Sequence, residues 1–176
     1  MTHPPTLNPV VVREWCLWVP LPPSKLGAKP KWMNLNERAH WGSRSGKTSV
    51  WRTSAAETAL KAASTHGIPR LEEAWVVAHF SFGDGRRRDV HNYLPTVKAC
   101  IDGFTDAGLW EDDCDGVLTG PDLRRMELRE ISADDLSSTP LKGIHFCIRE
   151  VIASGDQGLR KPPRRNSALG QRIQTD

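Results

Sequence analysis

Segments rich in β-branched and aromatic residues predict the strands of this chain. The clearest are Val10–Pro20, Ala74–Phe82 and Ile144–Val151, where apolar residues dominate. Val117–Thr119 and Arg124–Ile131 are shorter candidates that would complete a sheet. We expect the first strand to end at its terminal proline, because proline cannot donate a hydrogen bond to a neighbouring strand.

Two further segments carry apolar residues at the three- and four-residue spacing typical of amphipathic helices. Thr48–Thr65 is rich in alanine and is followed by Gly67 as a stop signal. Asn92–Ala107 has a proline in its predicted first turn and Gly108 after its end. The order of elements, β-α-β-α-β-β-β, predicts a single α+β domain with helices packed on a mixed sheet. The predicted buried stripes are Trp51, Ala55, Ala59 and Ala62 in the first helix and Leu94, Val97, Ile101 and Phe104 in the second.

Length and composition divide the chain into three parts. With 176 residues it can form one domain with a substantial core, which we place at residues 10–152. Residues 1–9 predict a flexible lead-in, and residues 153–176 predict a disordered basic tail because they contain almost no core-forming residues. No apolar run is long enough for a membrane span and no secretory leader is recognisable. We therefore expect a cytoplasmic protein with four reduced cysteines.

The segment Ser24–Lys47 predicts a long functional loop, because it combines basic residues with tryptophan and histidine. Gly42–Ser49 resembles a P-loop, but three residues instead of four separate its first glycine from the Gly-Lys pair. We therefore exclude nucleotide binding there. Tryptophans among basic residues can stack on unpaired DNA bases. For Trp41, stacking on DNA bases and packing in the protein core are equally supported. We expect Trp51 to pack in the core.

The net charge is +3, and its distribution is more informative than its size. Basic clusters surround an acidic centre between Asp102 and Asp115. That arrangement would suit a polyanionic partner with a metal ion at the point of chemistry. Charge alone favours the simpler interpretation, a solvated surface of mixed charge.

The most specific stretch is RRRDVHNYLPTVKACIDGFTDAGLWEDD, from Arg86 to Asp113. Asp89 and His91 would project to the same side of an extended segment. Lys98 and Asp102 are neighbours on one face of the following helix. Carboxylates can hold Mg²⁺ against a phosphate, and a lysine can stabilise charge on phosphoryl oxygens. The residue types also allow a plainer interpretation, an exposed helix end carrying a salt bridge.

This stretch resembles the signature of the RusA-type Holliday-junction resolvases, dimeric Mg²⁺-dependent endodeoxyribonucleases often carried by phages and prophages. The family pattern is an Arg-rich run, Asp-x-Asp-Asn, a lysine in the following helix, an Asp-Gly or Asp-Ala pair on that helix, and then Ala-Gly and Asp-Asp. The resemblance is dense over Arg86–Asp113 and weaker around Val19–Pro23. It implies a RusA-like fold and a metal-dependent, structure-selective endonuclease that resolves four-way and branched DNA in recombination and repair.

By position, the resemblance assigns catalytic roles to Asp89, Lys98 and Asp113. It assigns metal binding to Asp89, His91 and Asp113, with Mg²⁺ or Mn²⁺ as the ion. His91 is a departure, because the family has an aspartate there and an imidazole suits softer metals better than Mg²⁺. His91 then acts as ligand or base, or the site has decayed and the protein only binds branched DNA. In a third alternative a nearby acid takes over, namely Asp102, Asp112 or Asp115.

The resemblance also implies a homodimer and a DNA-binding surface. A two-fold dimer presents two sites to the two strands of one junction. Trp15, Leu17 and Trp18 on the first strand would serve either the dimer or the core. The place of action would be the cytoplasm of a bacterial host. Six basic residues are predicted to contact DNA: Arg86, Arg87 and Arg88 beside the acids, and Arg44, Lys47 and Arg52 near the first helix.

Overall fold

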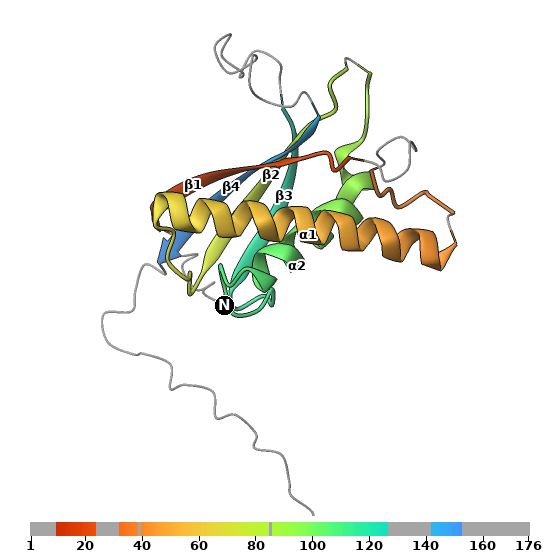
Figure 1. Cartoon of the computed structure of the whole chain (residues 1–176). Helices are drawn as coiled ribbons and strands as arrows, with labels where there is room; N and C mark the ends of the chain where they lie inside the picture. Colours follow the sequence, from red (N-terminus) through yellow and green to blue (C-terminus); the bar gives the residue numbers. More distant parts are fainter. Residues whose placement is uncertain (1–9, 24–31, 39, 85, 127–141, 153–176) are drawn as a thin grey trace, which may run out of the picture.

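The computed structural model describes residues 10–23, 32–38, 40–84, 86–126 and 142–152. Within these ranges it has four strands, two α-helices and one 3₁₀ turn (Figure 1). The predicted α+β class is confirmed, whereas the predicted lead-in and basic tail lie outside the described residues. In chain order the elements are β1 (Val10–Pro20), α1 (Trp41–His66), β2 (Ala74–Ser81), η2 (Val90–Tyr93), α2 (Leu94–Asp106), β3 (Leu118–Arg125) and β4 (Gly143–Ile152).

The four strands form one mixed sheet in the order β1-β4-β2-β3. Strand β4 lies between β1 and β2 and runs antiparallel to both, while β3 pairs with β2 in parallel. The parallel pair is connected through α2, because parallel strands need a crossover. Strands β1 and β3 are therefore the two edges of the sheet.

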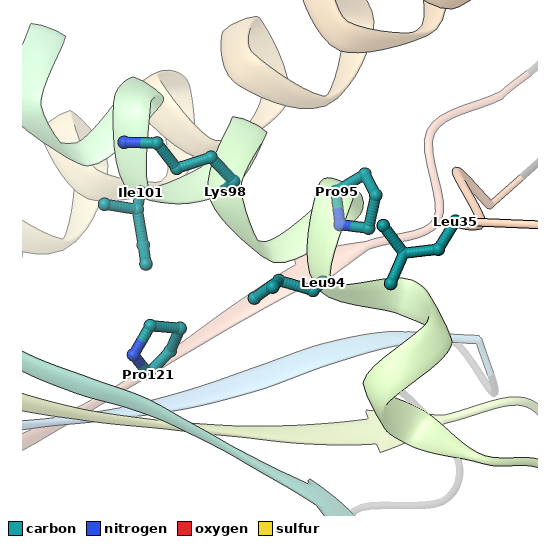
Figure 2. A pocket seen from close by; sticks show the side chains of 6 residues that line it. All are labelled: Leu35, Leu94, Pro95, Lys98, Ile101 and Pro121. Atoms are coloured by element: carbon teal, nitrogen blue, oxygen red, sulfur yellow. The ribbon is translucent and has the colours of Figure 1, made fainter.

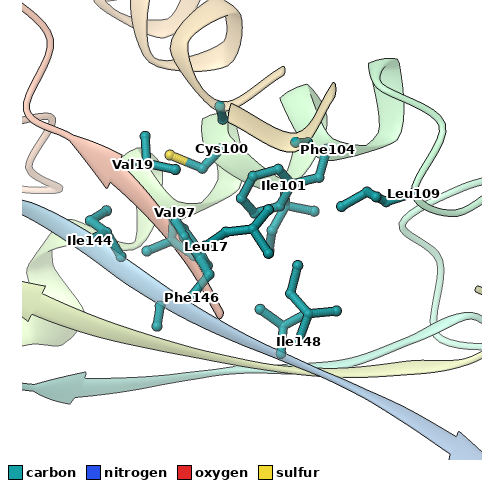
Figure 3. Packing of buried hydrophobic residues seen from close by; sticks show 14 of the residues in the cluster. Leu17, Val19, Val97, Cys100, Ile101, Phe104, Leu109, Ile144, Phe146 and Ile148 are labelled. Carbon is teal, nitrogen blue, oxygen red and sulfur yellow. The ribbon is translucent and has the colours of Figure 1, made fainter. Parts of the chain in front are cut away.

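Both helices lie on the same face of the sheet (Figures 1 and 3). Core residues from the strands include Leu17 and Phe146, and those from α2 include Val97 and Phe104, all of them buried. The rings of Phe104 and Phe146 meet edge to face with centroids 4.9 Å apart. Removing this apolar area from water is the main force that holds the helix layer on the sheet.

The two predicted helical stripes are largely confirmed. Trp51, Ala55 and Ala59 of α1 are buried, and so are three of the four predicted residues of α2. Leu94 is the exception, since 41 % of it is exposed. It is the first residue of α2.

Helix α1 begins earlier than predicted, so the segment from Trp41 to Lys47 is helical and not part of a loop. The start is set by His40, whose Nδ1 accepts a hydrogen bond from Gly42 N at 3.3 Å. Gly42 and Gly46 have poor helix propensity, which hid this first part of the helix in the sequence. The P-loop-like segment therefore has no phosphate-binding loop conformation.

The two shorter strand candidates, Val117–Thr119 and Arg124–Ile131, are wrong as separate elements. Part of each belongs to the continuous strand β3, which runs through the cis Gly120–Pro121 peptide bond. Proline is tolerated there because β3 is an edge strand, and the pairing with β2 shifts register at the same place. The end of the second candidate lies outside the described residues.

The segment that precedes α1 is tied to the start of α2. Met33 N donates to Thr96 Oγ1 at 2.9 Å, and the same hydroxyl donates to Met33 O at 2.9 Å. Leu35 N donates to Asn92 O at 2.8 Å. These bonds place residues 32–36 beside the motif that carries the candidate chemistry. In the described part of the chain, neither helix has the length and apolar character that a membrane span requires.

Candidate active site

Lys98 of α2 contacts two carboxylates. Its Nζ lies 3.1 Å from Asp102 Oδ1, one helical turn later, and it also pairs with Asp113 Oδ2 in the loop after the helix. Asp113 Oδ2 is closed to solvent at this contact, whereas the Lys98 side chain is 55 % exposed. The structure thus brings together the lysine, the helix acid and the last aspartate of the motif.

Asp113 reaches Lys98 because the chain turns back tightly after α2. Gly108 has a left-handed backbone (φ 78°), and its N–H donates to Thr105 O at 2.9 Å. Leu109 and Trp110 then enter the core, and Trp110 Nε1 donates to Thr105 Oγ1 at 2.8 Å. This anchored turn holds the acidic loop beside the exposed side of the helix.

Asp89 and His91 are arranged differently from the prediction. Asp89 caps the 3₁₀ turn η2, and its Oδ1 accepts a hydrogen bond from His91 N at 3.0 Å. His91 already lies inside that turn, and both residues are exposed. The expectation that they project to one side of an extended segment is therefore wrong, because the backbone turns directly after Asp89.

The three predicted metal ligands do not form a compact set. Across the described residues, Asp89, His91 and Asp113 do not place three ligand atoms within 4.8 Å of one another. Asp89 and Asp113 nevertheless supply the hard oxygen donors that Mg²⁺ prefers, and Mg²⁺ is commonly held by one or two carboxylates with waters and phosphate oxygens. The two carboxylates therefore fit Mg²⁺ by their donor atoms. Because the structure does not bring them together with His91, their role as ligands stays a prediction.

An apolar pocket of about 290 Å³ opens beside Lys98, between α2 and β3 (Figure 2). Its walls come from the start of α2, from β3 and from the segment before α1. The exposed apolar side chains Leu35 and Leu94 both face it, which accounts for their position at the surface. The lining residues are Leu35, Leu94, Pro95, Lys98, Ile101 and Pro121.

Arg88, predicted to contact DNA, is bound to its own loop. Its Nη2 donates to Asp84 Oδ2 at 2.9 Å and its Nη1 to Asp84 Oδ1. The guanidinium also lies 4.7 Å from the ring centroid of Phe82. Hydrogen bonding to Arg88 lowers the pKa of Asp84 well below its ordinary value, and the same bond raises the pKa of Arg88. Arg88 therefore shapes the loop that leads to Asp89.

The other predicted DNA-binding residues divide into paired and unpaired cations. Lys47 pairs with Glu37, and Arg52 donates to Asp106 through Nε at 2.5 Å and Nη2 at 2.6 Å. The remaining three are exposed and form no ion pair with any described carboxylate: Arg44, Arg86 and Arg87.

A second group of potential metal ligands escaped the sequence analysis. Cys16 of β1 and His145 and Cys147 of β4 each place one ligand atom within 4.8 Å of the others. Burial, with a smaller effect of the neighbouring Cys16, raises the pKa of the Cys147 thiol to about 12. The alternation of His145 and Cys147 along one strand is visible in the sequence. Cys16 joins them only through the β1–β4 register, which the sequence does not reveal.

No family model matches the chain, and no curated protein matches it. Neither comparison identifies the RusA-type family, so that resemblance rests on the sequence pattern, chiefly on the Arg86–Asp113 motif.

Proposed function

We propose that this chain is a metal-dependent endodeoxyribonuclease that cleaves Holliday junctions and other branched DNA. The observation that supports the proposal most is the contact of Lys98 with both Asp102 and Asp113. Lys98 and Asp102 belong to α2, and Asp113 belongs to the loop that follows the helix. The RusA-type motif assigns Lys98 and Asp113 to the site, and Asp102 is one of the nearby acids that could replace the missing carboxylate.

Each residue has a role in this proposal. Lys98 would stabilise negative charge that develops on the phosphoryl oxygens, which a compact and exposed ammonium group can do. Asp89 and Asp113 would hold Mg²⁺ or Mn²⁺, which when bound neutralises phosphate charge and activates water. Asp102 would keep Lys98 oriented after Asp113 turns to the ion. Arg86 and Arg87 would bind flanking phosphates.

The pocket beside Lys98 supports a nucleotide as part of the substrate. Leu94, Pro95 and Pro121 offer apolar surfaces to a base or sugar, and Lys98 contributes the apolar stem of its side chain to the wall. Its volume of about 290 Å³ lies just below the range of roughly 300–1,000 Å³ that is usual for small-molecule sites. That size would admit at most one nucleotide, which would have to be turned out of its stack.

Cleavage of a synthetic four-way junction in Mg²⁺ or Mn²⁺ tests this function. We expect the parent protein to cut, and Asp89→Asn, Asp113→Asn and Lys98→Ala each to lose at least about 100-fold in rate, because each removes charge stabilisation of the transition state. Glu57→Gln, an acid-to-amide change at an exposed position of α1, serves as control and should cut normally. If both aspartate variants cut as well as the parent, the site assignment is wrong.

A second function, binding of branched DNA without cleavage, is favoured by one feature. His91 stands where the family has a carboxylate, and the three predicted ligands do not form a compact set in the described residues. In that case the parent binds a junction without cutting it, and His91→Asp creates or greatly raises cleavage. An active parent that gains nothing from His91→Asp rules this second function out.

We also propose, from the resemblance, that the protein acts as a homodimer in the cytoplasm of a bacterial host. Leu17 of β1 belongs to the core, so it is not available for a dimer contact. Trp15 and Trp18 are only partly buried on the same edge strand. Sedimentation with and without a junction would measure the number of chains in the complex.

A further inference from the structure

The face of the sheet opposite α1 and α2 carries a compact thiol–imidazole group. Cys16 pairs with Cys147 across β1 and β4, and Trp18 pairs with His145 two residues further along. Side chains alternate along a strand, so these residues point away from the face on which Leu17 enters the core. No described helix covers this face (Figure 1).

The spacing of the ligand atoms matches a tetrahedral metal site. Cys147 Sγ lies 3.8 Å from His145 Nδ1, and all three ligand atoms, including Cys16 Sγ, lie within 4.8 Å of one another. With Zn–S bonds of about 2.3 Å and Zn–N bonds of about 2.0–2.1 Å, tetrahedral angles put sulfur and nitrogen about 3.6 Å apart. Small rotations of the side chains would shorten the distances between the ligand atoms to the values that a zinc ion needs. The backbone need not move, because the pairing of β1 with β4 already places the residues side by side.

We propose that Cys16, His145 and Cys147 bind one Zn²⁺ ion per chain. Two thiolates and an imidazole select zinc over Mg²⁺, which prefers oxygen ligands. A water molecule completes the tetrahedron, and each thiol releases its proton to solvent when the metal binds. The ion links the edge strand β1 to β4 and so stabilises the sheet.

The main competing state is a disulfide between the two cysteines. Both thiols are free in this structure, but they belong to directly paired residues of adjacent strands. Oxidation would consume two of the three ligands, so a protein that forms this disulfide cannot bind zinc in the proposed way. A test therefore needs fully reduced protein and a separate count of free thiols.

The experiment uses the full chain without an affinity tag, reduced and stripped of metal. Zn²⁺ is titrated against a chromophoric chelator, and Co²⁺ is added in parallel as a spectroscopic probe. We expect one ion per chain, a thiolate-to-Co²⁺ charge-transfer band and a higher melting temperature with Zn²⁺. Cys16→Ser is the decisive variant, because Cys16 is exposed and its loss leaves the core unchanged. It should weaken zinc binding by at least about 100-fold, more than loss of an outer-shell partner usually does.

Two matched controls separate this site from adventitious binding. Cys114→Ser removes another exposed cysteine, and His66→Ala removes an exposed histidine at the end of α1. Both should keep one zinc ion per chain, and Cys16→Ser without metal should melt like the parent without metal. Zinc bound equally by Cys16→Ser, or no zinc uptake by the reduced parent, overturns the proposal. If the unreduced parent shows two fewer free thiols than the reduced parent, and the reduced parent takes up no zinc, the pair forms a disulfide and not a zinc site. These readouts do not depend on junction cleavage.

Discussion

At the scale of single residues, the charged groups of the motif differ in whether they already hold a partner. Lys98 contacts Asp102 and Asp113, and Arg88 holds Asp84, whereas Arg86 has no described ion-pair partner. An exposed ion pair contributes only about 0–1 kcal/mol. The proposed function requires the partly exposed pairs of Lys98 to exchange a carboxylate for a phosphate, and weak pairs of this kind allow that exchange.

The Asp84–Arg88 pair makes a prediction about pH. Because Arg88 lowers the pKa of Asp84, the native state keeps the carboxylate ionised to lower pH than the unfolded chain does. The stability from this pair is present above the unfolded pKa of about 3.9 and is lost as pH falls toward the native pKa. We expect Asp84→Asn to lower the free energy of unfolding most near neutral pH, with a difference from the parent that shrinks below about pH 4.

Urea denaturation at a series of pH values measures this difference. Asp115→Asn changes an exposed aspartate that pairs with no described cation, and it serves as control. A difference for Asp84→Asn that stays constant across the acidic range would show that the Arg88 pair does not stabilise the native state.

At the scale of elements, the closest contact in the helix layer is the crossing of α1 and α2. Gly103 of α2 is buried, and a Cβ atom added there would lie 2.2 Å from Arg52 O and 3.0 Å from Ala55 Cβ. A backbone oxygen inside a helix cannot move aside. Only glycine allows α2 to lie this close to α1, and that closeness sets the position of Lys98 on the opposite side of α2.

Two glycine-to-alanine changes test this packing. Gly103→Ala should lower the free energy of unfolding by about 1–3 kcal/mol, the usual cost of overpacking. Gly46→Ala, in α1 with no other atom within 4 Å of the added Cβ, should instead stabilise the protein by about 0.5–1 kcal/mol through helix propensity. Thermal and urea unfolding of both variants measure the effects. Equal behaviour of the two variants would contradict the close crossing.

At the scale of the whole molecule, the two-layer architecture separates two kinds of chemistry. Lys98 and its carboxylates lie on the helix side of the sheet, while Cys16, His145 and Cys147 lie on the other side. The carboxylates proposed to bind Mg²⁺ and the thiols proposed to bind Zn²⁺ thus lie on opposite sides of the sheet. Loss of one site should leave the other intact.

The proposed DNA-binding surface can be tested through the salt dependence of four-way junction binding. The double variant Arg86→Ala with Arg87→Ala removes two unpaired cations and should lower the slope of log affinity against log salt by about 2. Arg52→Ala removes a cation that Asp106 already holds, so its slope should change little. Fluorescence anisotropy with a labelled four-way junction at several salt concentrations measures both. An equal change of slope in the two variants would contradict the distinction between cations that are free to bind phosphate and cations that a carboxylate already holds.

Local patterns in the sequence were sufficient for much of the fold. Strand β1 has the predicted bounds, the buried residues of α1 are those of the predicted stripe, and α2 has its proline in the first turn. These features depend on neighbours within a few residues, which the sequence displays directly. The sequence likewise determined which residue types the candidate site contains and the order in which they occur.

Tertiary structure decided which of those residues meet. The early start of α1 depends on the His40 cap, and the continuity of β3 through Gly120–Pro121 depends on pairing with β2. The contact of Lys98 with Asp113 depends on the anchored turn after α2, and the contact of Cys16 with Cys147 depends on the register of two strands that are far apart in the chain. Periodicity shows which face a side chain occupies. The partner on that face is chosen by the long-range packing of the sheet and helices, which no local pattern contains.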